Sequence, residues 1–225
     1  MQRGDPWAGV AERVAERYPS TCLDPSSHEF EGRLDEITAA CPPGSVPVGY
    51  SMGGRLALHA AVREPGRFAA LVLVGASAGI EDGAERAARA RADAELADWM
   101  ESQPIESVVE RWEANPVFAT QAPELVQAQR PGRLAHRPSD LARLLRSAGQ
   151  GACPPLWHQL GELECPLLAI AGEADERYAR AAERMAAAAP AGAAALVPGA
   201  GHAPQLEAPE ATARLLLELL DEHLG

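Results

Sequence analysis

The sequence predicts an α/β fold in which helices cover both faces of a mostly parallel sheet. Short apolar runs alternate along the chain with amphipathic or alanine-rich stretches, which is the order of strands and helices in such folds. Runs such as "FAALVLVGA" (68–76) contain no alternating polar residues, as expected for strands that are buried on both faces. Residues 81–161 break the alternation, because no strand is evident there. We therefore expect one α/β core with one helical insertion.

The individual elements follow from the spacing of apolar residues. Apolar side chains at helical spacing, such as Val10, Val14 and Tyr18, predict a helix near the start of the chain. The expected helices of the core are 6–18, 29–41, 52–63, 176–189 and 207–224. The expected strands are 21–23, 46–50, 68–76, 165–172 and 194–199.

The insertion is expected to form a helical lid. Several helices are expected there, including 83–100, 105–114 and 137–148, and the joints between them contain proline. Parallel sheets bind ligands at the carboxyl ends of their strands, so a helical block between two strands is most simply a cover over that edge. The core then comprises residues 1–80 and 162–225, and the lid comprises residues 81–161.

The composition excludes several classes of protein. A net charge of −12 would repel nucleic acid and anionic membrane surfaces, and no apolar run reaches the ~18 residues that a membrane span needs. The four cysteines are scattered, and no group of cysteines and histidines has the spacing of zinc ligands, so no metal is expected. The start of the chain has no signal-peptide pattern and the cysteines form no disulfide-dense pattern, so we expect a cytoplasmic protein.

A short motif in the first half of the chain predicts a nucleophilic serine. The segment "GYSMG" matches G-x-S-x-G, lies between a predicted strand and a predicted helix, and places Ser51 at the turn. Such a turn is strained and crowded. We therefore expect that a side chain at either position two residues from the serine, Gly49 or Gly53, would not fit. The backbone N–H of Met52, at the start of the following helix, is expected to face a developing oxyanion.

The partners of this serine are expected at the ends of later strands. Asp175 lies in "GEADERY" after the strand 165–172, and His202 lies in "GAGHAP" after the last strand. The chain order serine, acid, histidine is that of α/β-hydrolases. Glu173 remains an alternative for the acid. The non-catalytic interpretation makes Ser51 a turn residue, Asp175 a helix cap and His202 a surface histidine.

These residues make the chain similar to one family of the α/β-hydrolase superfamily, the 2-succinyl-6-hydroxy-2,4-cyclohexadiene-1-carboxylate synthases of menaquinone biosynthesis. The resemblance extends from about Trp7 to the C-terminus and is densest in "GYSMGGRLAL", "ERAARARADAELADWM", "RWEANPVFA", "GEADERY" and "GAGHAP". It implies an α/β-hydrolase fold and a lyase that needs no cofactor. Such a lyase expels pyruvate from 2-succinyl-5-enolpyruvyl-6-hydroxy-3-cyclohexene-1-carboxylate.

The resemblance also implies which residues act. Ser51, Asp175 and His202 would form the catalytic triad. The residues implied in binding a polycarboxylate substrate are Tyr50, Arg55, Arg89, Trp112 and Arg130. Arg55 lies one helical turn after Ser51 on the same helix face, and a buried guanidinium there suits a carboxylate better than a neutral ester. Arg133 and Arg137 compete with Arg130, and Trp112 could equally be a packing residue of the lid.

The start of the chain differs from the family pattern. Members of this family begin with two or three strands and an "HGF"-type loop that donates the second oxyanion N–H, whereas "GDPWAGVAERVAERY" resembles the helix after that loop. We therefore expect the N-terminal strands to be missing, through a misplaced start or a truly short chain. Two other functions stay open, namely a hydrolase of esters or C–C bonds and an inactive binding remnant. A monomer or a small homo-oligomer is expected.

Overall fold

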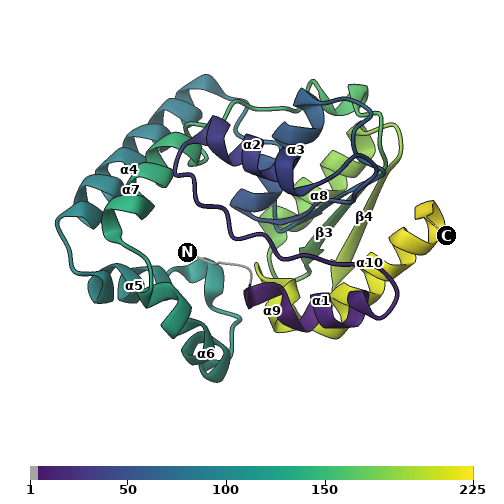
Figure 1. Ribbon diagram of the computed structural model, residues 1–225. Coiled ribbons are helices and arrows are strands. Elements are labelled where there is room, and N and C mark those ends of the chain that lie inside the picture. The colour runs from purple at the N-terminus through teal and green to yellow at the C-terminus, as the bar shows by residue number, and fades with distance from the viewer. Residues whose placement is uncertain (1–4, 225) are drawn as a thin grey trace.

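The computed structural model describes residues 5–224 and contains one parallel sheet of four strands in the order β1-β2-β3-β4. The strands are β1 (Val48–Tyr50), β2 (Leu71–Val74), β3 (Leu167–Gly172) and β4 (Gly192–Val197). All neighbouring pairs are parallel, and β2 and β3 meet with Leu71 opposite Leu167. The predicted parallel sheet is therefore confirmed (Figure 1).

One face of the sheet is covered by α2 (Phe30–Ala40), α3 (Met52–Arg63) and α8 (Glu176–Ala188). The strand residues that point toward these helices alternate in sequence, as side chains of a strand do, and include Leu71, Leu73, Leu167 and Ala169. These four side chains are almost completely buried. Each buried leucine contributes about 1.5–3 kcal/mol relative to an exposed one, so this layer is a substantial part of the stability of the core.

The opposite face is covered by α1 (Ala8–Ala15) and α10 (Pro209–Leu224), which lie side by side although they come from opposite ends of the chain (Figure 1). The strand residues that contact this pair are the other half of the alternation: Val72, Val74, Leu168 and Ile170. Helices on both faces agree with the prediction from the uninterrupted apolar runs. The short elements η1 (Asp5–Trp7) and α9 (Pro204–Glu207) lie beside α1.

The stretch between β2 and β3 contains no strand among the described residues. It contributes α4 (Gly83–Glu101), α5 (Ile105–Glu113), η2 (Pro116–Phe118), α6 (Pro123–Leu134) and α7 (Pro138–Ala148), with η3 (Leu160–Glu162) just before β3. The long helices α4 and α7 pack against each other on one side of the sheet (Figure 1). Their shared apolar layer is built around Ala97, Met100 and Leu141. We call residues 81–161 the helical segment.

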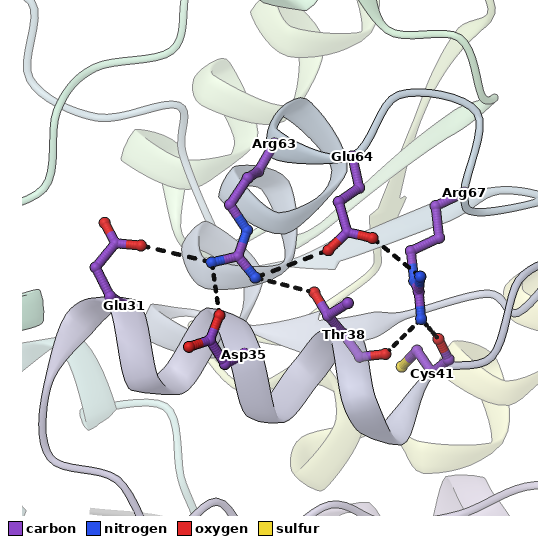
Figure 2. Close-up of polar contacts among 7 residues, drawn as sticks. All are labelled: Glu31, Asp35, Thr38, Cys41, Arg63, Glu64 and Arg67. Atoms are coloured by element: carbon purple, nitrogen blue, oxygen red, sulfur yellow. Dashed lines mark hydrogen bonds and ion pairs between the residues drawn. The ribbon is translucent and has the colours of Figure 1, made fainter.

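The last residue of α3 and the loop that follows it fix the position of α2. Arg63 lies 2.9 Å from Asp35 in α2, and Arg67 donates to the carbonyl oxygens of Thr38 (2.6 Å) and Cys41 (3.0 Å) at the end of α2 (Figure 2). These bonds satisfy carbonyl groups that a helix end leaves without intrahelical partners. They hold α2 against the helix that begins at the predicted nucleophile.

Two predictions about the elements are wrong. Residues 21–23 form no strand and lie in an irregular, largely exposed connection between α1 and α2. Helix α6 was not expected, because it contains Pro131 in its interior and begins with Pro123, and proline normally interrupts a helix. Pro123 occupies the first turn, where its missing N–H costs nothing. The other strands and helices are present, with bounds that differ by a few residues.

No helix within the described part of the chain is both long and apolar enough to cross a lipid bilayer.

Candidate active site

Ser51 lies in a strained turn between β1 and α3. Its φ of 50° and ψ of −111° make it the one non-glycine residue with positive φ among residues 5–224. Such a conformation costs about 1–3 kcal/mol and is found where function requires it. A Cβ on Gly49 would lie 2.6 Å from the carbonyl oxygen of Gly53. No side chain fits at this position, as the sequence motif predicts.

The second glycine of the motif is not required for the reason we expected. A Cβ on Gly53 would meet nothing within 4 Å, whereas a Cβ on Gly54 would lie 2.7 Å from the Cβ of Ala76. The close approach between helix and sheet therefore falls on Gly54, one position later. The prediction for Gly53 is wrong, because the helix turns this position away from the strand and into solvent.

The structure brings Ser51, Asp175 and His202 together in one hydrogen-bonded chain. The Nε2 atom of His202 lies 3.1 Å from the Oγ of Ser51, and its Nδ1 atom lies 2.8 Å from the Oδ2 of Asp175. Asp175 follows β3 and caps α8, while His202 lies in the loop between β4 and α9. Glu173, the alternative acid, is exposed and its carboxylate accepts the N–H of Gly199 instead.

Aromatic side chains surround the imidazole of His202. The ring centroids of Tyr178, Tyr50 and Phe118 lie 4.5, 5.3 and 6.2 Å from that of His202. Burial raises the pKa of Tyr50 far above its ordinary value, and the negative charges nearby add to the rise. The Tyr50 hydroxyl therefore stays protonated and can donate a hydrogen bond to an anionic ligand. Phe118 comes from the helical segment, so this segment covers the triad.

Arg55 is buried beside the first turn of α3. It is 5% exposed, and its Nη2 donates to the carbonyl oxygen of Ala148 at the end of α7, 3.1 Å away. Its Nε has no hydrogen-bond partner. The guanidinium is thus held inside the protein and links the core to the helical segment. Together with burial, its charge lowers the pKa of His59 to about 4.

Arg89 belongs to a chain of polar contacts that reaches the aromatic wall of the site. Its Nε donates to the buried Asp93 (2.7 Å) and its Nη1 donates to Gln150 (3.2 Å). The amide of Gln150 in turn bonds to the Tyr178 hydroxyl at 2.6 Å. Since the Tyr178 ring lies against His202, the chain connects α4 with the triad.

The two candidate arginines of α6 are positioned differently. Arg130 pairs with Glu113 and lies 3.7 Å from Glu110, and its side chain is 28% exposed. Arg133 is 2% exposed, shares Glu113 at 3.0 Å, and keeps its Nε and Nη2 without partners. Its charge is close enough to Tyr50 to oppose the rise in that pKa. Arg137 is 80% exposed and lies away from this cluster.

Several buried polar atoms around the triad have no partner within the protein. Buried donors and acceptors are almost always satisfied, so such atoms indicate a site for a polar ligand or water. Trp112 stacks on Phe118 with its Nε1 unpaired, and the Gln121 amide is unpaired at both atoms. Unpaired atoms of this kind also occur on Arg55 and Arg133, and on both amide atoms of Gln205, which is 1% exposed and lies three positions after His202.

The sequence did not indicate Gln121, Gln150 or Tyr178. They lie on three separate segments with no mutual spacing, and only the fold brings Tyr178 against His202 and Gln150 against Tyr178. Arg133 was recognised as a competitor of Arg130, but no periodicity in a proline-containing stretch could show which of the two is buried. Among residues 5–224, no cluster of three or more His, Cys, Asp or Glu side chains could hold a metal ion.

Comparison with known protein families agrees with the fold. A family model described as the alpha/beta hydrolase family matches residues 4–215. A thermophilic esterase from Thermogutta terrifontis has the same fold, with a TM-score of 0.81 at 22% identity over 98% of this chain and 86% of that structure. The chain belongs to the alpha/beta hydrolase family.

Individual relatives indicate which group within the alpha/beta hydrolase family the chain resembles most strongly in sequence and structure. The 2-succinyl-6-hydroxy-2,4-cyclohexadiene-1-carboxylate synthase of Enterobacter sp. strain 638 is 30% identical over 95% of this chain and 86% of its own length. A Bacillus subtilis relative is 35% identical over 77% of this chain, and the match spans 64% of that protein. The solved structure of MenH from S. aureus covers 99% of this chain, with 91% of its own length matched, at 28% identity and a TM-score of 0.89. Within its family, the chain is therefore grouped with these synthases.

Proposed function

We propose that this protein is a carbon–oxygen lyase that eliminates pyruvate from 2-succinyl-5-enolpyruvyl-6-hydroxy-3-cyclohexene-1-carboxylate. The product would be 2-succinyl-6-hydroxy-2,4-cyclohexadiene-1-carboxylate, an intermediate of menaquinone biosynthesis. One observation carries the proposal. The hydrogen-bonded chain of Ser51, His202 and Asp175 lies beneath a helical segment that contributes a buried arginine, Arg133, with unpaired N–H groups. The names of the relatives support the same reaction.

The triad supplies the base. Asp175 accepts a hydrogen bond at Nδ1 of His202, which leaves Nε2 free to accept the Ser51 proton 3.1 Å away. The Ser51 oxygen then removes the proton from ring carbon 2, which bears the succinyl group and lies next to its ketone. The two electrons of that C–H bond form the C2=C3 double bond, the C3=C4 electrons move to C4=C5, and the bond between ring carbon 5 and the enolpyruvyl oxygen breaks. The enolpyruvate that leaves takes up a proton and becomes pyruvate.

The backbone at the turn stabilises the negative charge that develops on the ketone oxygen. Met52 is the first residue of α3, and the first N–H groups of a helix have no intrahelical acceptor. The positive end of the helix dipole lies at the same place. A single donor of this kind commonly contributes ~10²–10³ to the rate.

The arginines hold the carboxylates of the substrate. Arg133 is the strongest candidate, because its unpaired Nε and Nη2 present two donors in the fork that a carboxylate accepts. We assign to Arg133 the role that the sequence suggested for Arg130, which is engaged by two glutamates. Arg55, Arg89, Tyr50 and Trp112 complete the proposed binding site.

The cellular setting follows from this chemistry. The substrate is a small polycarboxylate, and proton transfers alone carry out the elimination, so the scheme uses no metal or organic cofactor. An enzyme that acts between two cytoplasmic biosynthetic steps would itself be cytoplasmic. We propose a monomer or a small homo-oligomer.

The deciding experiment measures pyruvate release from the enolpyruvyl-bearing substrate. Ser51→Ala should abolish release, since the variant lacks the oxygen that takes the proton, while the melting temperature should change little because alanine keeps the same Cβ in the strained turn. Steady cleavage of a p-nitrophenyl ester with no pyruvate from the cyclohexene substrate would instead identify a hydrolase. Pyruvate release by the Ser51→Ala variant would rule out the mechanism.

A further inference from the structure

The loop that carries His202 is closely packed on three sides. A Cβ on Gly172, at the end of β3, would lie 2.0 Å from the carbonyl oxygen of Gly201, and a Cβ on Gly75, just after β2, would lie 2.6 Å from that of His202. On the third side, a Cβ on Gly201 would lie 2.0 Å from the Oγ1 of Thr120 in the helical segment. This packing fixes the carbonyl side of the loop, but it supplies no acceptor for the N–H groups.

A single carboxylate accepts the two N–H groups on either side of His202. Glu207 receives the N–H of Gly201 at Oε2 (2.8 Å) and the N–H of Ala203 at Oε1 (3.0 Å). Both N–H groups belong to buried residues, so they need acceptors within the protein. Bonds from backbone N–H groups to an ionised carboxylate are shorter and stronger than bonds between neutral groups.

Glu207 is also close to the reacting groups. Its charge is one of the causes that raise the pKa of Tyr50, the residue next to Ser51. Because its two oxygens hold the residues before and after His202, a displacement of Glu207 moves the backbone from which the imidazole extends. The distance from Nε2 of His202 to Ser51, 3.1 Å, is therefore set in part by a side chain that touches neither of them.

We propose that Glu207 is a positioning residue for His202, which holds the histidine loop so that its imidazole bridges Ser51 and Asp175. The alternative is that Glu207 is only a helix cap, since Ala203 precedes α9 and its N–H is one of the two donors. The N–H of Gly201 lies outside that helix and has no place in a cap. The proposal rests on the proposed function in that it takes His202 as the base.

Glu207→Gln tests the proposal with the smallest change of shape. The amide oxygen can accept one of the two N–H groups, but the amide nitrogen is a donor that faces the other. We expect kcat for pyruvate release to fall about 10- to 100-fold, since small misplacements of a reacting group cost this much, while KM changes by less than about twofold. Glu210→Gln is the matched control, because Glu210 is 81% exposed and pairs with Arg13 at the surface.

A second measurement does not depend on the reaction. The Nδ1 proton that His202 shares with Asp175 should give a far-downfield proton NMR signal, and this signal should broaden or disappear in Glu207→Gln and persist in Glu210→Gln. If the unmodified protein releases no pyruvate but the signal responds in this way, the proposed function fails and the positioning role stands. If Glu207→Gln lowers only the melting temperature, with kcat and the signal unchanged, Glu207 is a helix cap and the proposal is wrong. Should this variant not fold, Glu207→Asp, which can reach only one N–H, carries the same expectations.

Discussion

Arg130 and Arg133 lie three residues apart on α6 and both pair with Glu113, but they differ in how many of their nitrogen atoms lack a hydrogen-bond partner. Arg130 is engaged by two glutamates, whereas Arg133 is buried with two unpaired donor atoms. We predict that Arg133→Met raises KM for the polycarboxylate substrate about 10- to 100-fold, as expected for the loss of charge-assisted bonds worth ~1.5–3 kcal/mol. Arg130→Met is the matched control and should change KM by less than about threefold. Steady-state pyruvate release measures both, and a larger effect at Arg130 would reverse the assignment.

His59 gives the stability of the protein a specific dependence on pH. Burial, aided by the charge of Arg55, lowers its pKa to about 4, whereas an unfolded histidine titrates near ~6.5. As the pH falls through this window, the unfolded state binds a proton at His59 and the folded state does not. The contribution of His59 to the free energy of unfolding is therefore complete above about pH 6.5 and is lost toward pH 4.

The measurement is urea unfolding at about pH 7 and about pH 4.5. His59→Gln should reduce the loss of unfolding free energy between these pH values by about 1–2 kcal/mol, after allowance for the partial exposure of this side chain. His158→Gln, at an exposed histidine, should leave the loss unchanged. An identical loss in the unmodified protein and in His59→Gln would show that other groups cause it.

At the scale of single residues, the sequence predicted the groups that a local pattern marks. Ser51 lies in a motif with its own backbone geometry, and Asp175 and His202 each follow a recognisable strand, so the fold places them at one edge of the sheet. Gln150 and Tyr178 are 28 positions apart and are joined only by tertiary packing. No periodicity connects them, which is why such partners could not be predicted.

At the scale of elements, the contact between α2 and α3 depends on two arginines of unequal importance (Figure 2). Arg63 meets Glu31 and Asp35, whose side chains are 74% and 72% exposed, and exposed pairs contribute little. Arg67 is 22% exposed and donates to two main-chain carbonyl groups at the end of α2. Those carbonyl groups would lose their partners if the guanidinium were removed.

Arg67→Ala should therefore lower the free energy of unfolding by about 1–3 kcal/mol, the cost of leaving partly buried acceptors unsatisfied. Arg63→Ala should lower it by less than about 1 kcal/mol. Chemical denaturation of both variants makes the comparison, and near-equal losses would mean that the surface carboxylates matter as much as the carbonyl groups. Neither variant should change KM, because the contact lies away from the triad.

The helices and strands that could be predicted best are those whose burial requires a clear apolar pattern in the sequence. The strands β2 and β3 are apolar throughout and buried along their whole length, so their runs stand out in the sequence. The wrong strand at 21–23 rested on three residues in a stretch rich in serine and proline. Helix α6 was missed because its stability comes from packing and from the pairs with Glu113, which outweigh the unfavourable Pro131.

At the scale of the whole molecule, a net charge of −12 opposes a substrate that carries several carboxylates. The arginines of the site attract it at short range, but the field felt at a distance is that of the whole surface. At low salt this repulsion extends over tens of ångströms, while at ~0.2 M salt it is screened within ~7–8 Å. Encounter should therefore be slowest at low ionic strength.

We predict that kcat/KM for pyruvate release rises as NaCl is increased from about 20 mM to about 200 mM, because screening removes the long-range repulsion first. The value of kcat at saturating substrate is the internal control and should stay within about twofold, since it excludes the encounter step. Uncharged sucrose at matched viscosity controls for diffusion. A steady fall of kcat/KM over the same range would mean that the arginines of the site already dominate the field at a distance, and that the acidic surface is oriented away from the entrance to the site.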